Sequence, residues 1–425
     1  MTEAAADIPW IPHIPKDDTW TLLALIVSGT AASIWLERRY RWAEKLSGPV
    51  IALLIAMILS NTGIMPADAP AYDFVGGWLV PLALPLLLFR ANIVRIARKT
   101  GKLLIAFNLA AVGTMIGAVA GFFLLKDHIP EPDKAAGVMT ASYIGGMVNF
   151  VAVSASTKAS GTMTSSLIVA DNIIMAGLFL VLFWMVGSAF LRRIFRVQYG
   201  LDASTALAGE EMPEKPPKPV LDVLDLGVAL GVAFCIAAAA MLLQRYLNLE
   251  LTGGKEDWRD HVSKGKQMGI DLLTNKFVLI TALSLIAATF FSRPLEKLQS
   301  AEPVGSFMLY LFLFCVGLPA DVKSMFLGGE KGMVMLYLFL FCFIIAAANL
   351  IFVTLTARFF KLSLEDIVLA SNASVGGPPT AAAMAMSKGW SRLVLPGLLA
   401  GLYGYSVGTP LGLMITHLLS NFMPK

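Results

Sequence analysis

Long apolar runs separated by short polar stretches dominate this chain. The first half has runs at about 19–36, 48–65, 74–89, 103–125, 137–157 and 162–191, and the second half at about 221–244, 275–291, 304–320, 333–357, 364–386 and 392–419. Many are close to the length of about 20 residues that a membrane-spanning helix needs. The pattern predicts an all-α polytopic membrane protein with about 12 transmembrane segments.

Two of these runs are interrupted by a polar stretch that holds a glycine pair. The pairs are Gly145-Gly146 and Gly376-Gly377, and their offset is 376 − 145 = 231 residues. The same offset maps the apolar run from Leu103 onto the run from Val334 without a gap. We therefore predict an internal duplication, with a first repeat at 1–191, a polar linker at 192–220 and a second repeat at 221–425. Each repeat is expected to hold one broken crossing helix, at about 137–157 and at about 364–386.

Composition agrees with a membrane protein. Apolar residues make up 57% of the chain and charged residues 15%, against about 45–50% and about 25% in soluble proteins. The net charge of +4 is small and gathered in short loops, which excludes a nucleic-acid surface and indicates topology-setting charge. The N-terminus lacks the basic segment of a cleavable signal. We expect an integral protein of a bacterial inner membrane.

Basic residues give a first indication of topology. They are concentrated in the loops after the first and third runs. Because basic loops tend to lie on the cytoplasmic side, the N-terminus is expected to face outward. Equivalent runs of the two halves are six apart. If every run crosses the membrane once, this even separation makes the repeats parallel, whereas an odd separation would invert them; the sequence does not decide between the two.

The polar breaks are the first candidate site. Paired broken helices in two halves of a membrane protein indicate the binding site of a secondary transporter, because unwound backbone at membrane depth is tolerated only in a cavity or inside protein. Half-helix N-termini suit a carboxylate and C-terminal carbonyl groups suit Na⁺. The alternative is a pair of kinked helices whose polar side chains only satisfy the backbone. The candidate binding residues, which we expect to gather at one central site, are Ser142, Gly145, Gly146, Asn149, Ser371, Asn372, Ser374, Gly376, Gly377 and Thr380.

Asp171 is the second candidate. It lies well inside the long apolar run that follows the first break, and an ionisable group at that depth is a functional candidate. Asn172 adds a further oxygen ligand. The equivalent residues of the second half are Leu402 and Tyr403, so the second half offers no Lys or Arg at these positions to neutralise the Asp171 carboxylate. The carboxylate is therefore expected to hold Na⁺ or a proton; the alternative is a polar residue near the membrane interface or packed against backbone. No other metal and no cofactor is expected.

Some features suit a smaller role. Arg90 and Asp321 are equivalent at the same offset and suit an ionic gate, an anion contact or, more simply, topology-setting loop charges. Tyr143, Tyr403 and Tyr405 could border a substrate cavity.

The stretch Ala370-Ser-Asn-Ala-Ser-Val-Gly-Gly-Pro-Pro-Thr-Ala381 carries a resemblance to a known family. Most of the chain resembles the DUF819 (YjcL-like) family, within the cation:proton antiporter and anion transporter superfamily. The resemblance implies a core of two inverted three-helix units whose broken helices cross at mid-membrane, beside a scaffold domain. It also implies an ion-coupling role for Asp171-Asn172, which matches an acidic or Asn-Asp pair of similar proteins with the order changed.

An enzyme is not expected, since the four His lack metal-ligand spacing and no nucleophile elbow or Walker A loop is present. The sequence predicts a secondary active transporter that moves a small organic anion with Na⁺ or H⁺, as a homodimer in the lipid bilayer. The chief rival is a cation:proton antiporter without an organic substrate. A membrane receptor or binding protein without flux is a third alternative.

Overall fold

A computed structural model describes residues 13–41, 43, 48–197, 222–254, 262–319, 330–388 and 390–423. Apart from one isolated bridge between Arg196 and Ser363, these residues form helices and connecting turns without β-strands. Eight of the helices in the described ranges are long and apolar enough to cross a membrane, or nine if one bent pair forms a single span. The protein is therefore an all-α polytopic membrane protein. Positions 198–220 of the predicted linker and Asp321 lie outside the described residues.

The first half contains α1 (Thr19–Arg39), α3 (Gly48–Asn61), α4 (Pro70–Phe74), the π-helix η1 (Val75–Leu79), α5 (Val80–Leu88), α6 (Ile93–Lys99), α7 (Lys102–Leu125), α8 (Pro132–Thr157), α9 (Gly161–Gly187) and α10 (Ala189–Ile194). The second half contains α12 (Val223–Thr252), α13 (Lys264–Leu273), α14 (Lys276–Phe290), α15 (Ser292–Leu295), α16 (Ala301–Gly317), α18 (Glu330–Thr356), α19 (Leu364–Val375), α20 (Gly377–Ser387) and α21 (Ser391–Ser420). Twelve full-length spans are not recovered, because α3, α14 and α16 have only 14, 15 and 17 residues and the run at 364–386 is divided into two helices.

Helix α8 folds back on itself. Lys134 Nζ, near its start, donates to the carbonyl oxygen of Lys158 at 3.2 Å, although 24 residues of straight helix would separate them by about 36 Å. The Glu131 carboxylate likewise accepts from the backbone N–H of Ser160. The reversal occurs at Gly145 and at Gly146, where φ is 65°. The expected broken crossing helix at 137–157 is thus a helical hairpin, which we call hairpin 1 (132–157).

Helices α19 and α20 form a second hairpin, hairpin 2 (364–387). Asn372 Nδ2 lies 3.1 Å from Met384 Sδ, whereas the twelve residues between them would span about 18 Å in a straight helix. Gly377 has a φ of 83°, a conformation that favours glycine, but Gly376 does not. Pro378 and Pro379 follow in the first turn of α20, where a missing N–H costs little. The expected crossing at 364–386 is therefore also a hairpin.

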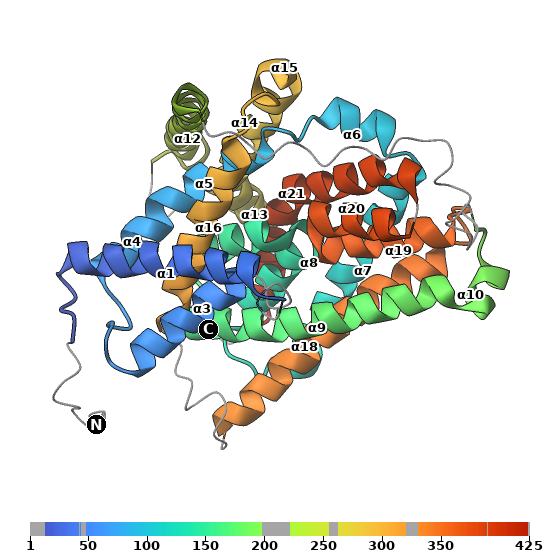
Figure 1. Cartoon of the computed structure of the whole chain (residues 1–425), viewed down its shortest axis with the longest axis horizontal. Helices are drawn as coiled ribbons and strands as arrows, with labels where there is room; N and C mark the ends of the chain where they lie inside the picture. The colour runs from blue at the N-terminus through green and yellow to red at the C-terminus, as the bar shows by residue number, and fades with distance from the viewer. Residues whose placement is uncertain are drawn as a thin grey trace.

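Both hairpins lie along α21 and approach it from opposite ends. Hairpin 1 contacts Gly412 through Ala141 and Val153, and hairpin 2 contacts Gly397 through Leu369 and Ala381. These two glycines are about 22 Å apart along the helix. In Figure 1, α19, α20 and α21 lie side by side. The reversing tips therefore point toward one another.

Helices α7 and α18 cross in close contact through three glycines of α7. Gly113 lies against Phe352, Gly117 against Ala348 and Gly121 against Ile344. Residue numbers rise along α7 as they fall along α18, so the two helices run antiparallel. Small residues allow this close approach of backbones in lipid.

Two groups of helices result from this packing. The hairpin group contains both hairpins with α7, α9, α18 and α21, and the outer group contains α1, α3, α4, η1, α5, α12, α14 and α16. Separate apolar clusters hold the outer helices together.

Candidate functional site

The two hairpin tips meet inside the hairpin group. The Ser374 hydroxyl, just before the tip of hairpin 2, donates to the carbonyl oxygen of Tyr143, just before the tip of hairpin 1. Both tip glycines with positive φ, Gly146 and Gly377, also lie against the ring of Tyr405. Tyr405 of α21 therefore contacts both tips at once. Four tip residues remain partly exposed, namely Gly146, Met147, Gly376 and Thr380.

Asn349 of α18 is the hydrogen-bonding hub beside the tips, and it is fully buried. Its amide nitrogen donates to Thr114 at 2.9 Å and lies 3.3 Å from the Ser374 hydroxyl, while its oxygen accepts from Ser371 at 2.7 Å. The network joins α7, α18 and hairpin 2. Asn349 is not among the residues predicted from the sequence, although a lone amide inside the apolar run 333–357 is a usable signal.

The remaining polar tip residues form two separate sets. In hairpin 2, Thr380 donates to Asn372 Oδ1 at 2.7 Å and to the carbonyl oxygen of Gly377 at 3.0 Å. In hairpin 1, Asn149 donates to the Gly145 carbonyl oxygen and accepts from both the backbone and the hydroxyl of Thr409. Within the described chain, no hydrogen bond joins Asn149 to the polar side chains of hairpin 2. The tips meet through Ser374 and Tyr405 instead.

Asp171 of α9 lies beside hairpin 1 and is only 6% exposed. The Ser142 hydroxyl lies 3.4 Å from its Oδ2 atom. The side chains of Tyr143 and Cys342 are also neighbours of the carboxyl group. Among the described residues, neither Asp171 Oδ1 nor the Tyr143 hydroxyl makes a hydrogen bond of normal geometry. A buried carboxyl oxygen that makes no hydrogen bond of normal geometry is costly, so this position suits a bound cation or proton.

The Asn172 side chain does not contribute a free ligand atom beside Asp171 through its amide nitrogen. Its amide nitrogen donates to the carbonyl oxygen of Ile168, one turn earlier in α9, at 2.7 Å. The side chain thus satisfies its own helix.

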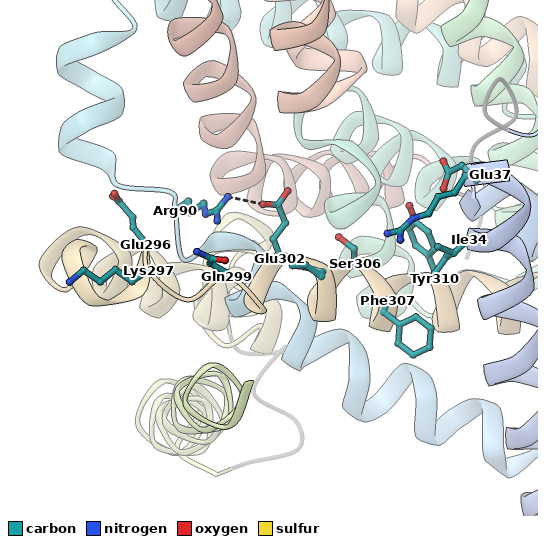
Figure 2. A pocket seen from close by; sticks show the side chains of 12 residues that line it. Ile34, Glu37, Arg90, Glu296, Lys297, Gln299, Glu302, Ser306, Phe307 and Tyr310 are labelled. Carbon is teal, nitrogen blue, oxygen red and sulfur yellow. Dashed lines mark hydrogen bonds and ion pairs between the residues drawn. The ribbon is translucent and has the colours of Figure 1, made fainter. Parts of the chain in front are cut away.

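Arg90 lies away from the hairpin tips, at a cavity of about 620 Å³ between α1, α5 and α16. Figure 2 shows its ion pair with Glu302, with 2.9 Å between Nη1 and Oε2. Both partners belong to the outer group, and both are about half exposed. An exposed pair of this kind contributes roughly 0–1 kcal/mol. The pair joins the segment after α5 to the first turn of α16.

Comparison with known proteins assigns the chain to a family. A family model described as "Protein of unknown function (DUF819)" matches residues 24–422. The chain belongs to the DUF819 family. A relative from Bacillus subtilis (strain 168), named "Uncharacterized membrane protein YjcL", is 36% identical over 414 residues, which cover 96% of this chain and 99% of the relative. The predicted family is therefore confirmed, and the chain spans the full length of a membrane protein of that family.

Proposed function

We propose that this DUF819 protein is a secondary active transporter that couples Na⁺ or H⁺ to movement of a small organic anion by alternating access. The observation that carries the proposal is the meeting of two helical hairpins from opposite directions, with a buried, incompletely bonded carboxyl group beside one of them. Irregular backbone inside a membrane protein is characteristic of ion and substrate sites.

The architecture that fits this function is a pair of inverted repeats. If the hairpins do not cross the membrane, each half has five crossings and one hairpin. The odd number inverts the second half relative to the first, which agrees with the antiparallel crossing of α7 and α18. The crossing segments are then α1, α3, α4–α5, α7 and α9, followed by α12, α14, α16, α18 and α21.

The contacts suggest how an ion at Asp171 is coupled to the hairpins. Ser142 and Tyr143, the neighbours of Asp171, are consecutive residues of hairpin 1, and the Tyr143 carbonyl oxygen accepts from Ser374 of hairpin 2. Gain or loss of a cation at Asp171 therefore changes the charge beside the residues that join the tips. A ligand shifts a conformational equilibrium only through such a difference in binding between states.

A cation:proton antiporter is the second candidate, and one observation favours it. Apart from the contact of Ser142 with Asp171, the hydrogen bonds at the tips, in the described part of the chain, join neutral groups only. Asp171 alone would then exchange a cation for a proton. A membrane receptor that binds a ligand without transporting it is the third candidate function.

Reconstitution into proteoliposomes separates these functions. We expect uptake of a labelled organic anion from a metabolite library to depend on an imposed Na⁺ or pH gradient, and to disappear when the gradient is collapsed. Cation-driven proton movement without any anion flux would select the antiporter. Saturable binding with no flux of either kind would select the receptor.

A further inference from the structure

Two adjoining cavities, of about 580 and 320 Å³, flank the last turn of hairpin 1. Ala155, Lys158 and Lys276 line both of them. Lys158 follows hairpin 1, whereas Lys276 begins α14 of the outer group. Each cavity therefore lies between the hairpin group and the outer group, on the side where hairpin 1 opens.

The two lysines have no acidic partner in the described chain. Asp133 and Asp271 line the larger cavity and Asp73 the smaller one, but none of them is within ion-pair distance of either lysine. Asp271 lies 3.4 Å from His417 instead. The ammonium group of Lys276, a partly buried residue, lies 5.0 Å from the centre of the Phe277 ring. A partly desolvated charge without a counter-charge is unfavourable, and a bound anion would relieve it.

An irregular helix forms another wall of the smaller cavity. Gly76 and Gly77 line it and belong to the π-helix η1. Apart from its chain neighbours and the backbone of its own helix, no heavy atom of the described residues lies within 4 Å of where a Cβ atom of Gly77 would be. Single-turn π-helices occur frequently at functional sites. The smaller cavity is therefore lined in part by an irregular helix.

We propose that Lys158 and Lys276 form an anion-binding entrance, at which a small water-soluble carboxylate, sulfonate or phosphate compound approaches hairpin 1 between the two helix groups. The role in transport rests on the proposed function, whereas the attraction of an anion to the two lysines does not require transport. One lysine comes from each group, so the entrance changes shape when the groups move relative to each other. Lysine provides a point charge without fixed geometry, which suits capture of an anion more than recognition of its shape.

The electrostatic field of Lys158 and Lys276 can be measured without knowing the substrate. A cysteine is introduced at Ala155 in the full-length protein, with Cys235 and Cys315 replaced by alanine; Cys342 is fully buried. Reaction rates are measured with two thiol reagents of similar size, the anionic 2-sulfonatoethyl and the cationic 2-trimethylammonioethyl methanethiosulfonate. We expect the anionic-to-cationic rate ratio to fall roughly threefold to tenfold in Lys276→Gln and in Lys158→Gln. Lys276→Arg is expected to retain the ratio, and 0.5 M NaCl to reduce it in the parent protein, because salt screens charges beyond a few Å.

The matched control is Lys126→Gln. Lys126 follows α7 on the same side of the protein but lines neither cavity, so the ratio is expected to stay unchanged. Asn248→Cys, in the wall of the larger cavity, serves as a second reporter. An equal ratio in the parent and in both Lys→Gln variants would overturn the proposal, as would failure of both reporters to react with either reagent.

Transport measurements separate this inference from the proposed function. If anion flux exists, Lys276→Gln is expected to raise KM about tenfold with little change in kcat. Absence of flux in the parent protein would reject the transporter but leave the reagent ratios standing. Normal flux with unchanged KM and unchanged ratios would reject only the entrance.

Discussion

Ser374 donates a hydrogen bond to the carbonyl oxygen of Tyr143, the residue 231 positions earlier in the chain. This separation equals the offset that aligns the two glycine pairs. Gly117 and Ala348, which also touch, are separated by 348 − 117 = 231 residues. Equivalent residues of two repeats can touch only near the axis that relates them. Two such contacts therefore suggest a pseudo-two-fold axis through the α7–α18 crossing and the hairpin tips.

Replacement of Asp171 tests the coupling site. Asp171→Asn keeps the shape of the side chain but removes its charge, so we expect ion-coupled flux to fall at least tenfold while the purified protein stays folded. Asn172→Ala is the matched control, because Asn172 bonds to its own helix, and flux is expected to change less than twofold. Unaltered Na⁺ and pH dependence in Asp171→Asn would exclude this carboxyl group from coupling.

Cysteine labelling tests the hairpin geometry. Asp133→Cys and Thr157→Cys, at the two ends of hairpin 1, are expected to react with a membrane-impermeant reagent from the same side of the membrane. Lys388→Cys, after hairpin 2, is expected to react from the opposite side only. A helix that crosses the membrane would place positions 133 and 157 on different sides, and that result would contradict the re-entrant hairpin.

Three glycine substitutions separate backbone strain from crowding. At Gly117 an added Cβ would lie 2.7 Å from Ala348 Cβ and 2.8 Å from Ile345 Cα, so Gly117→Ala is expected to cost about 1–3 kcal/mol. Gly377 has room for a Cβ atom but a φ of 83°, so Gly377→Ala is expected to cost about 1–2 kcal/mol through strain. Gly177 has neither restriction, and Gly177→Ala is expected to be neutral or to stabilise by about 0.5–1 kcal/mol.

Melting temperatures of the purified variants, with ion affinity measured on the same samples, check the glycine series. A loss of affinity confined to Gly377→Ala is expected if the tip of hairpin 2 borders the site. Equal affinity in all three variants would make this tip purely structural.

Removal of Asn349 tests the polar network. Asn349→Leu leaves the buried hydroxyl of Ser371 without its acceptor, whereas Thr114 keeps its bond to the Ala110 carbonyl oxygen, and an unpaired buried polar group costs about 1–3 kcal/mol. We expect a lower melting temperature than in Asn108→Leu, where the lost amide bonds to Leu104 and Tyr403 at a more exposed position. Equal melting temperatures would show that the network contributes little.

The ionisation of Glu131, the residue just before hairpin 1, is expected to make the stability of the protein depend on pH. Burial disfavours the ionised form of Glu131, but hydrogen bonds from Lys134 and Ser160 outweigh it and lower the pKa of the carboxyl group. A lowered folded-state pKa gives stability that is present above the unfolded-state pKa and is lost as pH falls through the folded-state pKa. Glu131→Gln should therefore flatten the fall in melting temperature between neutral and acid pH. An unchanged slope would exclude this contribution.

Much of the fold follows from the sequence pattern, since the apolar runs place most helices and the glycine pairs mark both reversals. The reversals themselves could not be predicted, because an apolar run of about 21 residues has the same composition whether it crosses the membrane or folds back. That ambiguity leaves the number of crossings, and with it the relative orientation of the two halves, undecided by the sequence. The neighbours of Asp171 and Asn149 could not be predicted from the sequence either. Cys342 approaches Asp171, and Thr409 approaches Asn149, only because distant helices pack together.

The position of α21 at the end of the chain has a consequence for biogenesis. Hairpin 1 is complete at residue 157, but the helix that covers it begins at Ser391. At synthesis rates of about 5–20 residues per second, roughly 12–47 s pass between them. During that interval Asn149 lacks its partner Thr409, and the hairpin glycines lack the backbone they pack against. Assembly of the centre of this protein is therefore a post-insertion event that awaits its last helix, and a nascent chain cut short before residue 391 exposes hairpin 1 to membrane quality control.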